Sequence, residues 1–333
     1  MRRTVLALLV LCAAFAQSGY HQIKKIPIPG DGFWDYLTTD GAGRVYVSHG
    51  TEVAVVDAKK GEVVGTITGL KLIHGIAIAS EFNRGFISDG GAKSVVIFDP
   101  KTLAKTGDVP AGTNPDAIIY DAATKRVFAF NGGSANATAV DAEKGALAGT
   151  VTLEGKPEFA IGDGKGHVYV NIEDKSEIMD IDAKALTVAH KWPLTGCEEP
   201  SGISMDLKTR RIFSGCDNKV LAVTNADTGK VVATPPIGDG VDAVWFDPGT
   251  KFVLSSCGQD AVLTVIHEDS PDKYTVVENV KTQKGARTMA LDPKTHNVYL
   301  ALAEVQMLPT PEGEKRPRRK VMPGTFQLLE YGR

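Results

Sequence analysis

Seven positions, spaced about 42 residues apart, carry side chains that can meet only if the fold brings distant segments together. Six of the seven are ionisable. In chain order the positions are Asp35, His74, Asp116, Glu158, Ser201, Asp242 and Arg287. Trp34 precedes the first, and Glu199 lies two residues before Ser201. Together these nine side chains are the ligand-binding candidates.

The chemistry of this set points first to a cation. Carboxylate oxygens favour calcium or magnesium, and an imidazole would admit a transition metal. The candidate metal ligands are His74, Asp116, Glu158, Glu199 and Asp242. A carboxylate crowded by others should have a raised pKa and could act as an acid or base. Arg287 could hold a carboxylate of a ligand through two hydrogen bonds.

These residues are positioned by a repeat that fills the chain after residue 20. Each copy contains four short segments rich in β-branched and aromatic residues, separated by turns with Asp, Gly, Lys or Thr. The third segment ends on a polar residue, in order Asp57, Asp99, Asp141, Asp182, Asn225 and Glu268. Seven copies of four antiparallel strands predict an all-β, seven-bladed β-propeller with the candidate residues at the first position of each inner strand.

The two ends of the repeat predict how the ring closes. Residues 20–28 read as a fourth strand with no first three before it, and residues 325–332 as a third strand with no fourth after it. Each would complete the other in the last blade. We therefore expect one domain over residues 20–333. A structural interpretation of the polar ring stays open, in which Asp side chains bond loop amides and tie blades together.

The N-terminus reads as a secretory signal peptide. Arg2 and Arg3 precede an apolar run from Val5 to Phe15, and Ala14-Phe15-Ala16 matches a cleavage site. We expect cleavage after Ala16, and no later segment of the chain reads as a transmembrane span. These features predict a periplasmic or secreted protein, which we expect to be a monomer.

Charge and cysteine content narrow the function classes. The formal net charge is −3, which argues against a nucleic-acid-binding face. A Pro-rich basic insertion at 307–324 is the exception; its Lys315, Arg316, Arg318, Arg319 and Lys320 could contact an acidic partner, a membrane surface or nucleic acid.

The cysteines predict one disulfide, which export favours. Cys197 and Cys216 fall in one blade and are the expected pair, which leaves Cys257 free.

The segments "RVYVSHG…VAVVDAKKGEVVGTI" and "PSGISMDLKTRRIFSGC…AVTNADTGKVVATPPIG" resemble the YVTN-repeat, YncE-like propeller proteins of bacterial envelopes. The resemblance implies a WD40-like propeller and export, and no single activity. No haem, zinc-protease, serine-hydrolase or phosphate-loop motif occurs. We expect a binding protein or scaffold for an envelope protein or small ligand. The alternative is a divalent-metal-dependent, lactonase-like hydrolase or lyase with its site at the channel mouth.

Overall fold

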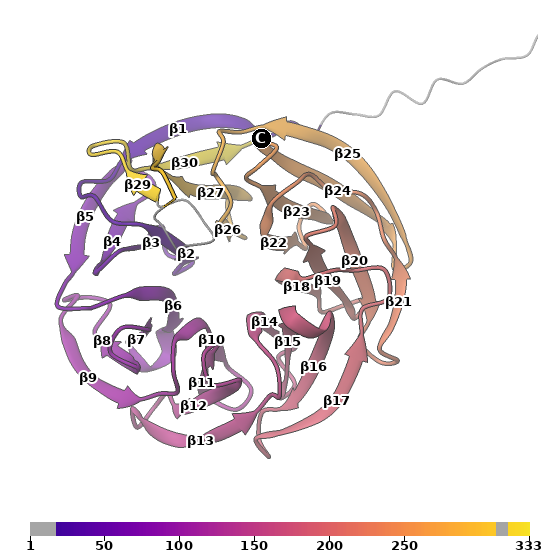
Figure 1. Ribbon diagram of the computed structural model, residues 1–333, viewed down its shortest axis with the longest axis horizontal. Helices are drawn as coiled ribbons and strands as arrows, with labels where there is room; N and C mark the ends of the chain where they lie inside the picture. The colour runs from indigo at the N-terminus through magenta and orange to yellow at the C-terminus, as the bar shows by residue number, and fades with distance from the viewer. Residues whose placement is uncertain (1–17, 311–318) are drawn as a thin grey trace, which may run out of the picture.

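The chain folds into a ring of seven four-stranded antiparallel sheets, which confirms the propeller predicted from the repeat (Figure 1). The computed structural model describes residues 18–310 and 319–333. The inner strands, nearest the axis, are β2 (Trp34–Thr39), β6 (Ile73–Ala79), β10 (Pro115–Asp121), β14 (Pro157–Gly162), β18 (Pro200–Asp206), β22 (Val241–Asp247) and β26 (Met289–Asp292).

The middle strands of each blade are buried almost throughout. The second strands are β3 (Arg44–His49), β7 (Arg84–Asp89), β11 (Arg126–Asn131), β15 (His167–Ile172), β19 (Arg211–Cys216), β23 (Phe252–Cys257) and β27 (Asn297–Leu302). The third strands are β4 (Glu52–Asp57), β8 (Ser94–Phe98), β12 (Asn136–Asp141), β16 (Glu177–Asp182), β20 (Val220–Asn225), β24 (Val262–Ser270) and β30 (Gln327–Gly332). Neighbouring blades cover both faces of these strands, so their apolar runs are continuous.

The outer strands alternate between exposed and half-buried residues, because one face meets solvent. They are β5 (Glu62–Ile67), β9 (Lys105–Pro110), β13 (Ala146–Thr152), β17 (Thr187–Pro193), β21 (Lys230–Ala233), β25 (Lys273–Lys281) and β1 (His21–Pro27). β1 pairs with β30, so the first described strand completes the last blade, as predicted. The buried side chains of Tyr20, Ile26 and Ile28 stabilise this closure of the ring.

The polar residue at the end of the third strand has a local cause. The side chain of Asp57 accepts the backbone N–H of Lys60, and Asp141 accepts that of Lys144 in the same way. These bonds fix the turn into the outer strand, and Gly61 and Gly145 follow with positive φ. The period of the sequence is therefore a period of turns.

Arginines at the start of second strands join neighbouring blades. Each donates from its guanidinium to a carbonyl in the next blade's turn between third and outer strands. The pairs are Arg44 with Pro100, Arg84 with Ala142, Arg126 with Ala183 and Lys184, and Arg211 with Pro271. Together with these hydrogen bonds, six clusters of buried apolar side chains hold the blades against one another.

The insertion in the last blade forms a short hairpin between its second and third strands. The hairpin strands are β28 (Val305–Met307) and β29 (Arg319–Val321). Two single turns of 3-10 helix, η1 (Ser80–Phe82) and η2 (Glu173–Lys175), complete the described elements. Within the described ranges no helix has the length and apolarity needed to cross a bilayer.

Candidate functional site

The predicted polar ring lies where the inner strands begin, with one correction to its register. In six blades the ring residue is the second residue of its strand, and Arg287 precedes β26 by two residues. A register shift at the start of those six strands interrupts the ladder beside the ring residue. An unpaired bulge residue can turn its side chain out of the sheet, and here that direction is the channel mouth.

Buried hydroxyl and amide groups on the second strands hold this irregular backbone. The N–H of Asp35 donates to Ser48 Oγ at 2.9 Å. Ser88 donates to the carbonyl of Asp116 in the next blade, and Asn171 Nδ2 donates to that of Ser201 at 2.8 Å. These bonds replace the missing ladder hydrogen bonds. Side chains of the second strands therefore hold the backbone at the ring positions.

One part of the ring is a histidine between two carboxylates of adjacent blades. His74 Nδ1–H donates to Asp35 Oδ2 at 2.7 Å, and Asp116 Oδ1 lies 3.5 Å from the same nitrogen. Burial alone would lower the pKa of His74, but the hydrogen bond to Asp35 and the charge of Asp116 outweigh it and raise the pKa. The three residues offer ligand atoms within 4.8 Å of one another, close enough to hold a metal ion together.

Two carboxyl groups of the ring have raised pKa values. Burial, followed by the charge of Asp35, raises the pKa of Asp116 to about 7. Burial also raises the pKa of Glu158 to about 8, although Lys156 Nζ lies 2.7 Å from its Oε1. Lys156 pairs in addition with Glu173. Asp116 and Glu158 therefore titrate near neutral pH.

A third part of the ring is an ion pair between blades six and seven. Arg287 Nη1 donates to Asp242 Oδ2, and Ser201 Oγ donates to Asp242 Oδ1 at 3.2 Å. Burial raises the pKa of Asp242, with the Arg287 charge opposing that rise. The charge of Asp35 also raises the pKa of Asp242, so carboxylates of blades one and six interact.

An aromatic contact across the axis was not predicted from the sequence. Tyr36 of blade one and Phe159 of blade four lie with ring centroids 4.2 Å apart. Beneath them the inner strands line an apolar channel of about 390 Å³, with Ile76, Ile118 and Val244 among its walls. The contact thus forms a floor under the polar mouth.

A signal for this floor was present in the repeat. The residue after each ring position is small in five copies and aromatic in two. The small residues are Gly75, Ala117, Gly202, Ala243 and Thr288. Tyr36 and Phe159 depart from this pattern in blades that face each other across the ring.

The remaining candidates lie apart from this cluster. Trp34 is buried between blades and packs on Phe326 at 5.7 Å between ring centroids, so it does not face the mouth. Glu199 is exposed, and its N–H donates to Ser176 Oγ. Arg319 and Lys320 are exposed on β29, whereas Lys315, Arg316 and Arg318 lie outside the described residues.

The cysteines behave as predicted. Cys197 and Cys216 form a disulfide with Cα atoms 5.4 Å apart, which ties the loop entering β18 to the end of β19. Cys257 is a free, buried cysteine, and burial raises the pKa of its thiol. Its environment suppresses the thiolate that metal binding or nucleophilic attack requires.

Comparison with known proteins gives a fold and no family. No family model matches the chain, and no curated protein matches it significantly. Its structure is similar to that of hydrazine synthase from Kuenenia stuttgartiensis, with a TM-score of 0.72 and 15% identity, covering 82% of this chain and 94% of that one. The chain is also similar to the RRP9 WD40 repeats, with a TM-score of 0.77 and 7% identity, covering 93% and 97% of the two chains.

A chain of the mitotic checkpoint complex is similar over 97% of this chain and 100% of its own length, with a TM-score of 0.74 and 14% identity. Identities this low carry the architecture and leave activity open. The protein has the fold of a seven-bladed β-propeller, similar in architecture to the RRP9 WD40 repeats.

Proposed function

We propose that this protein is an exported, non-enzymatic binding propeller that recognises a partner protein or small ligand on its loop-bearing face. That face carries the polar ring, the loops entering the inner strands and the β28–β29 hairpin. The proposal includes a periplasmic or secreted location, supported by the signal-peptide pattern of residues 1–16, which lie outside the described residues. It also includes membership of the YVTN-repeat, YncE-like family, supported by the quoted repeat segments.

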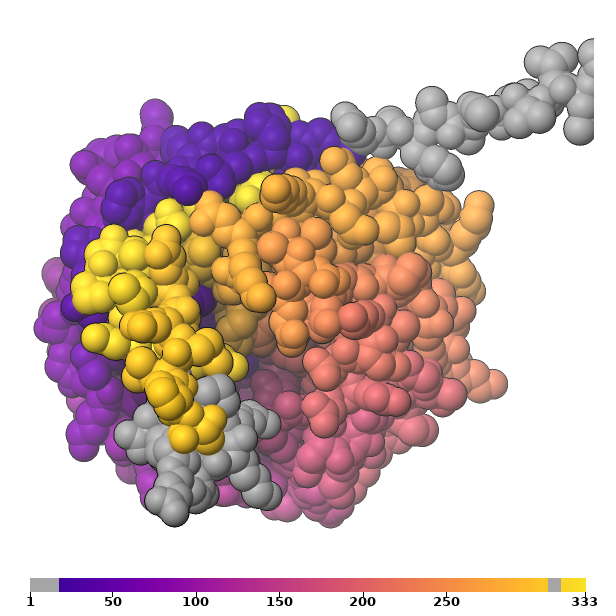
Figure 2. Space-filling model, turned by 45° about the horizontal axis from the view of Figure 1, so that its top comes forward, coloured from indigo at the N-terminus to yellow at the C-terminus, as the bar shows by residue number. Residues whose placement is uncertain are grey.

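The observation that carries the proposal is a group of exposed apolar side chains on this face. Phe33 and Leu72 are each 50% exposed, Met307 is 55% exposed and Met322 is 36% exposed. We call these four residues the apolar arc. They lie on blades seven, one and two, which are consecutive around the ring. The yellow C-terminal surface in Figure 2 belongs to this region.

Backbone hydrogen bonds hold the loops that carry the arc. Gly50 bridges its first two loops, because its N–H donates to the carbonyl of Phe33 and its carbonyl accepts the N–H of Ile73. The backbone of Met322 accepts a bond from Thr325, next to the Phe326 ring that packs on His49 at 4.1 Å between centroids. Exposed apolar residues gathered on a rigid scaffold are typical of a protein-interaction surface.

Site-specific photo-crosslinking in the source cell tests this function. A crosslinking side chain at position 72 should give one discrete adduct, and Phe33→Ser should reduce that adduct at least tenfold. Position 147 is the matched control, since Leu147 is 56% exposed on an outer strand away from this face. Equal adducts from both positions, or none from position 72, would contradict the proposal.

A metal-dependent hydrolase or lyase is the second candidate, favoured by the grouping of Asp35, His74 and Asp116. A divalent ion held there would polarise a substrate carbonyl and lower the pKa of its bound water. Of the other candidate ligands, Glu158 pairs with Lys156, Asp242 pairs with Arg287, and Glu199 is exposed and lies apart from the cluster. Metal analysis of purified protein tests this alternative, and stoichiometric metal lost in the Asp116→Asn variant would support it.

A further inference from the structure

We propose that the channel mouth binds a primary alkylammonium group, in a cup whose walls are the ring carboxylates and whose floor is the Tyr36–Phe159 pair. This inference deepens the proposed binding function, because it names the chemistry of a ligand on the same face. It does not depend on the apolar arc, so the two can fail separately.

The charges of the cup favour a cation. Five carboxylates face three basic groups when Glu173, which pairs with Lys156, is counted with the ring. The carboxylates are Asp35, Asp116, Glu158, Glu173 and Asp242, and the basic groups are His74, Lys156 and Arg287. The carboxyl groups outnumber the basic groups by two, and because burial raises the pKa of Asp116 to about 7 and that of Glu158 to about 8, a bound cation would stabilise their negative charges. Water does not fully screen them, since the mouth carboxyls are largely buried.

The floor favours an organic cation. The Tyr36 hydroxyl belongs to the residue that follows Asp35, and its pKa is raised first by burial and then by the charges of carboxylates from four blades. Among the described residues it has no hydrogen-bond partner. The phenol oxygen can accept a bond from an ammonium group, and the two aromatic rings attract a cation through their faces.

The same geometry disfavours a hard metal ion. Calcium needs six to eight oxygen ligands, but Asp242 is held by Arg287 and Ser201, and Glu158 by Lys156. An ammonium group needs only three acceptors. The aromatic pair crosses the axis beneath the cup, so an attached alkyl chain is directed outward through the mouth. The side chain of a partner's lysine and a free alkylamine share this chemistry.

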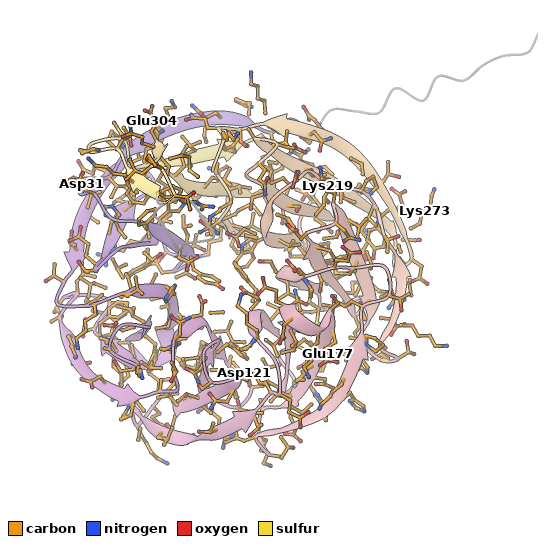
Figure 3. The ribbon with its side chains drawn as sticks, in the orientation of Figure 1. Asp31, Asp121, Glu177, Lys219, Lys273 and Glu304 are labelled. Carbon is orange, nitrogen blue, oxygen red and sulfur yellow. A yellow bond between two sulfur atoms is a disulfide. The ribbon has the colours of Figure 1, made fainter. Side chains whose placement is uncertain are left out.

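Calorimetric titration tests the proposal with two probes. One is n-butylammonium, and the other is a short peptide that contains a single lysine and has both termini blocked. Wild-type protein should bind at least one probe, and the matching norleucine peptide and 1-butanol should not bind. The double variant Asp116→Asn/Glu158→Gln should bind at least tenfold more weakly. Asp31→Asn and Glu304→Gln should bind normally, because these exposed acids lie toward the rim (Figure 3).

The arms of the experiment separate the sources and the alternatives. A lysine peptide that binds tenfold tighter than butylammonium identifies a partner side chain, and the reverse order identifies a free amine. Phe33→Ser and Leu72→Ser should leave both affinities unchanged, whatever their effect on crosslinking. Tyr36→Leu should weaken binding of both probes. Tyr36→Phe should weaken binding less, because it removes the hydroxyl acceptor but keeps the aromatic ring. Equal binding by the double variant, no binding by wild type, or stoichiometric calcium or zinc in place of the amine would overturn the proposal.

Discussion

Glu158→Gln should stabilise the folded protein at alkaline pH, because it removes a charge that the mouth holds at a cost. The pKa of Glu158 is raised from 4.5 to about 8 by burial. The folded state therefore binds more protons than the unfolded state between these values, and stability falls as pH rises through that window. At 1.36 kcal/mol per pH unit, the upper limit of the effect is ~5 kcal/mol.

The realised gain should be smaller, about 2–3 kcal/mol at pH 9, because part of the shift comes from Asp116 and the two carboxyls titrate together. Denaturant unfolding at pH 5, 7 and 9 measures it. The stabilities of wild type and variant should be closest at pH 5, separate as the pH rises to about 8 and stay apart at pH 9, and the exposed control Glu304→Gln should follow wild type. Parallel curves for wild type and Glu158→Gln, or a less stable variant at pH 9, would refute the reasoning.

Three further changes test the scaffold. Replacing Cys197 and Cys216 by Ser should cost about 3 kcal/mol in the loop-entropy description, and reductant should lower wild type to the same stability; no change in either case would argue against the bridge. Deleting residues 20–28 removes the outer strand of the last blade with its buried apolar side chains, so an unchanged melting temperature would contradict ring closure through β1. Arg126→Ala should cost about 1–2 kcal/mol in unfolding experiments by removing its bonds to the next blade, and Arg126→Lys should recover part of that loss.

The architecture could be predicted because it is written locally and repeatedly. Turn chemistry after each third strand recurs with a fixed period, and that period is enough to count blades and to assign residues 20–28 to the last one. The disulfide followed from the same alignment, since Cys197 and Cys216 fall at two ends of one blade. Each of these features depends on contacts within a repeat or between repeats of known order.

The site could be predicted only as a set of positions. How the ring divides into pairs depends on side-chain directions, and Lys156 and Glu173 enter it from outside the aligned position. The Tyr36–Phe159 contact joins residues that become neighbours only when the ring closes. Trp34 adjoins Asp35 in the sequence, but alternation along the strand turns its side chain into the core.

The Tyr36–Phe159 contact also acts as a strut. It joins two blades that share no sheet and no direct strand pairing, so blades one and four are coupled directly as well as through the blades between them. Aromatic pairs contribute about 1 kcal/mol beyond the area they bury. A substitution at Tyr36 or Phe159 should therefore be felt in both blades, although the two positions are more than a hundred residues apart in the sequence.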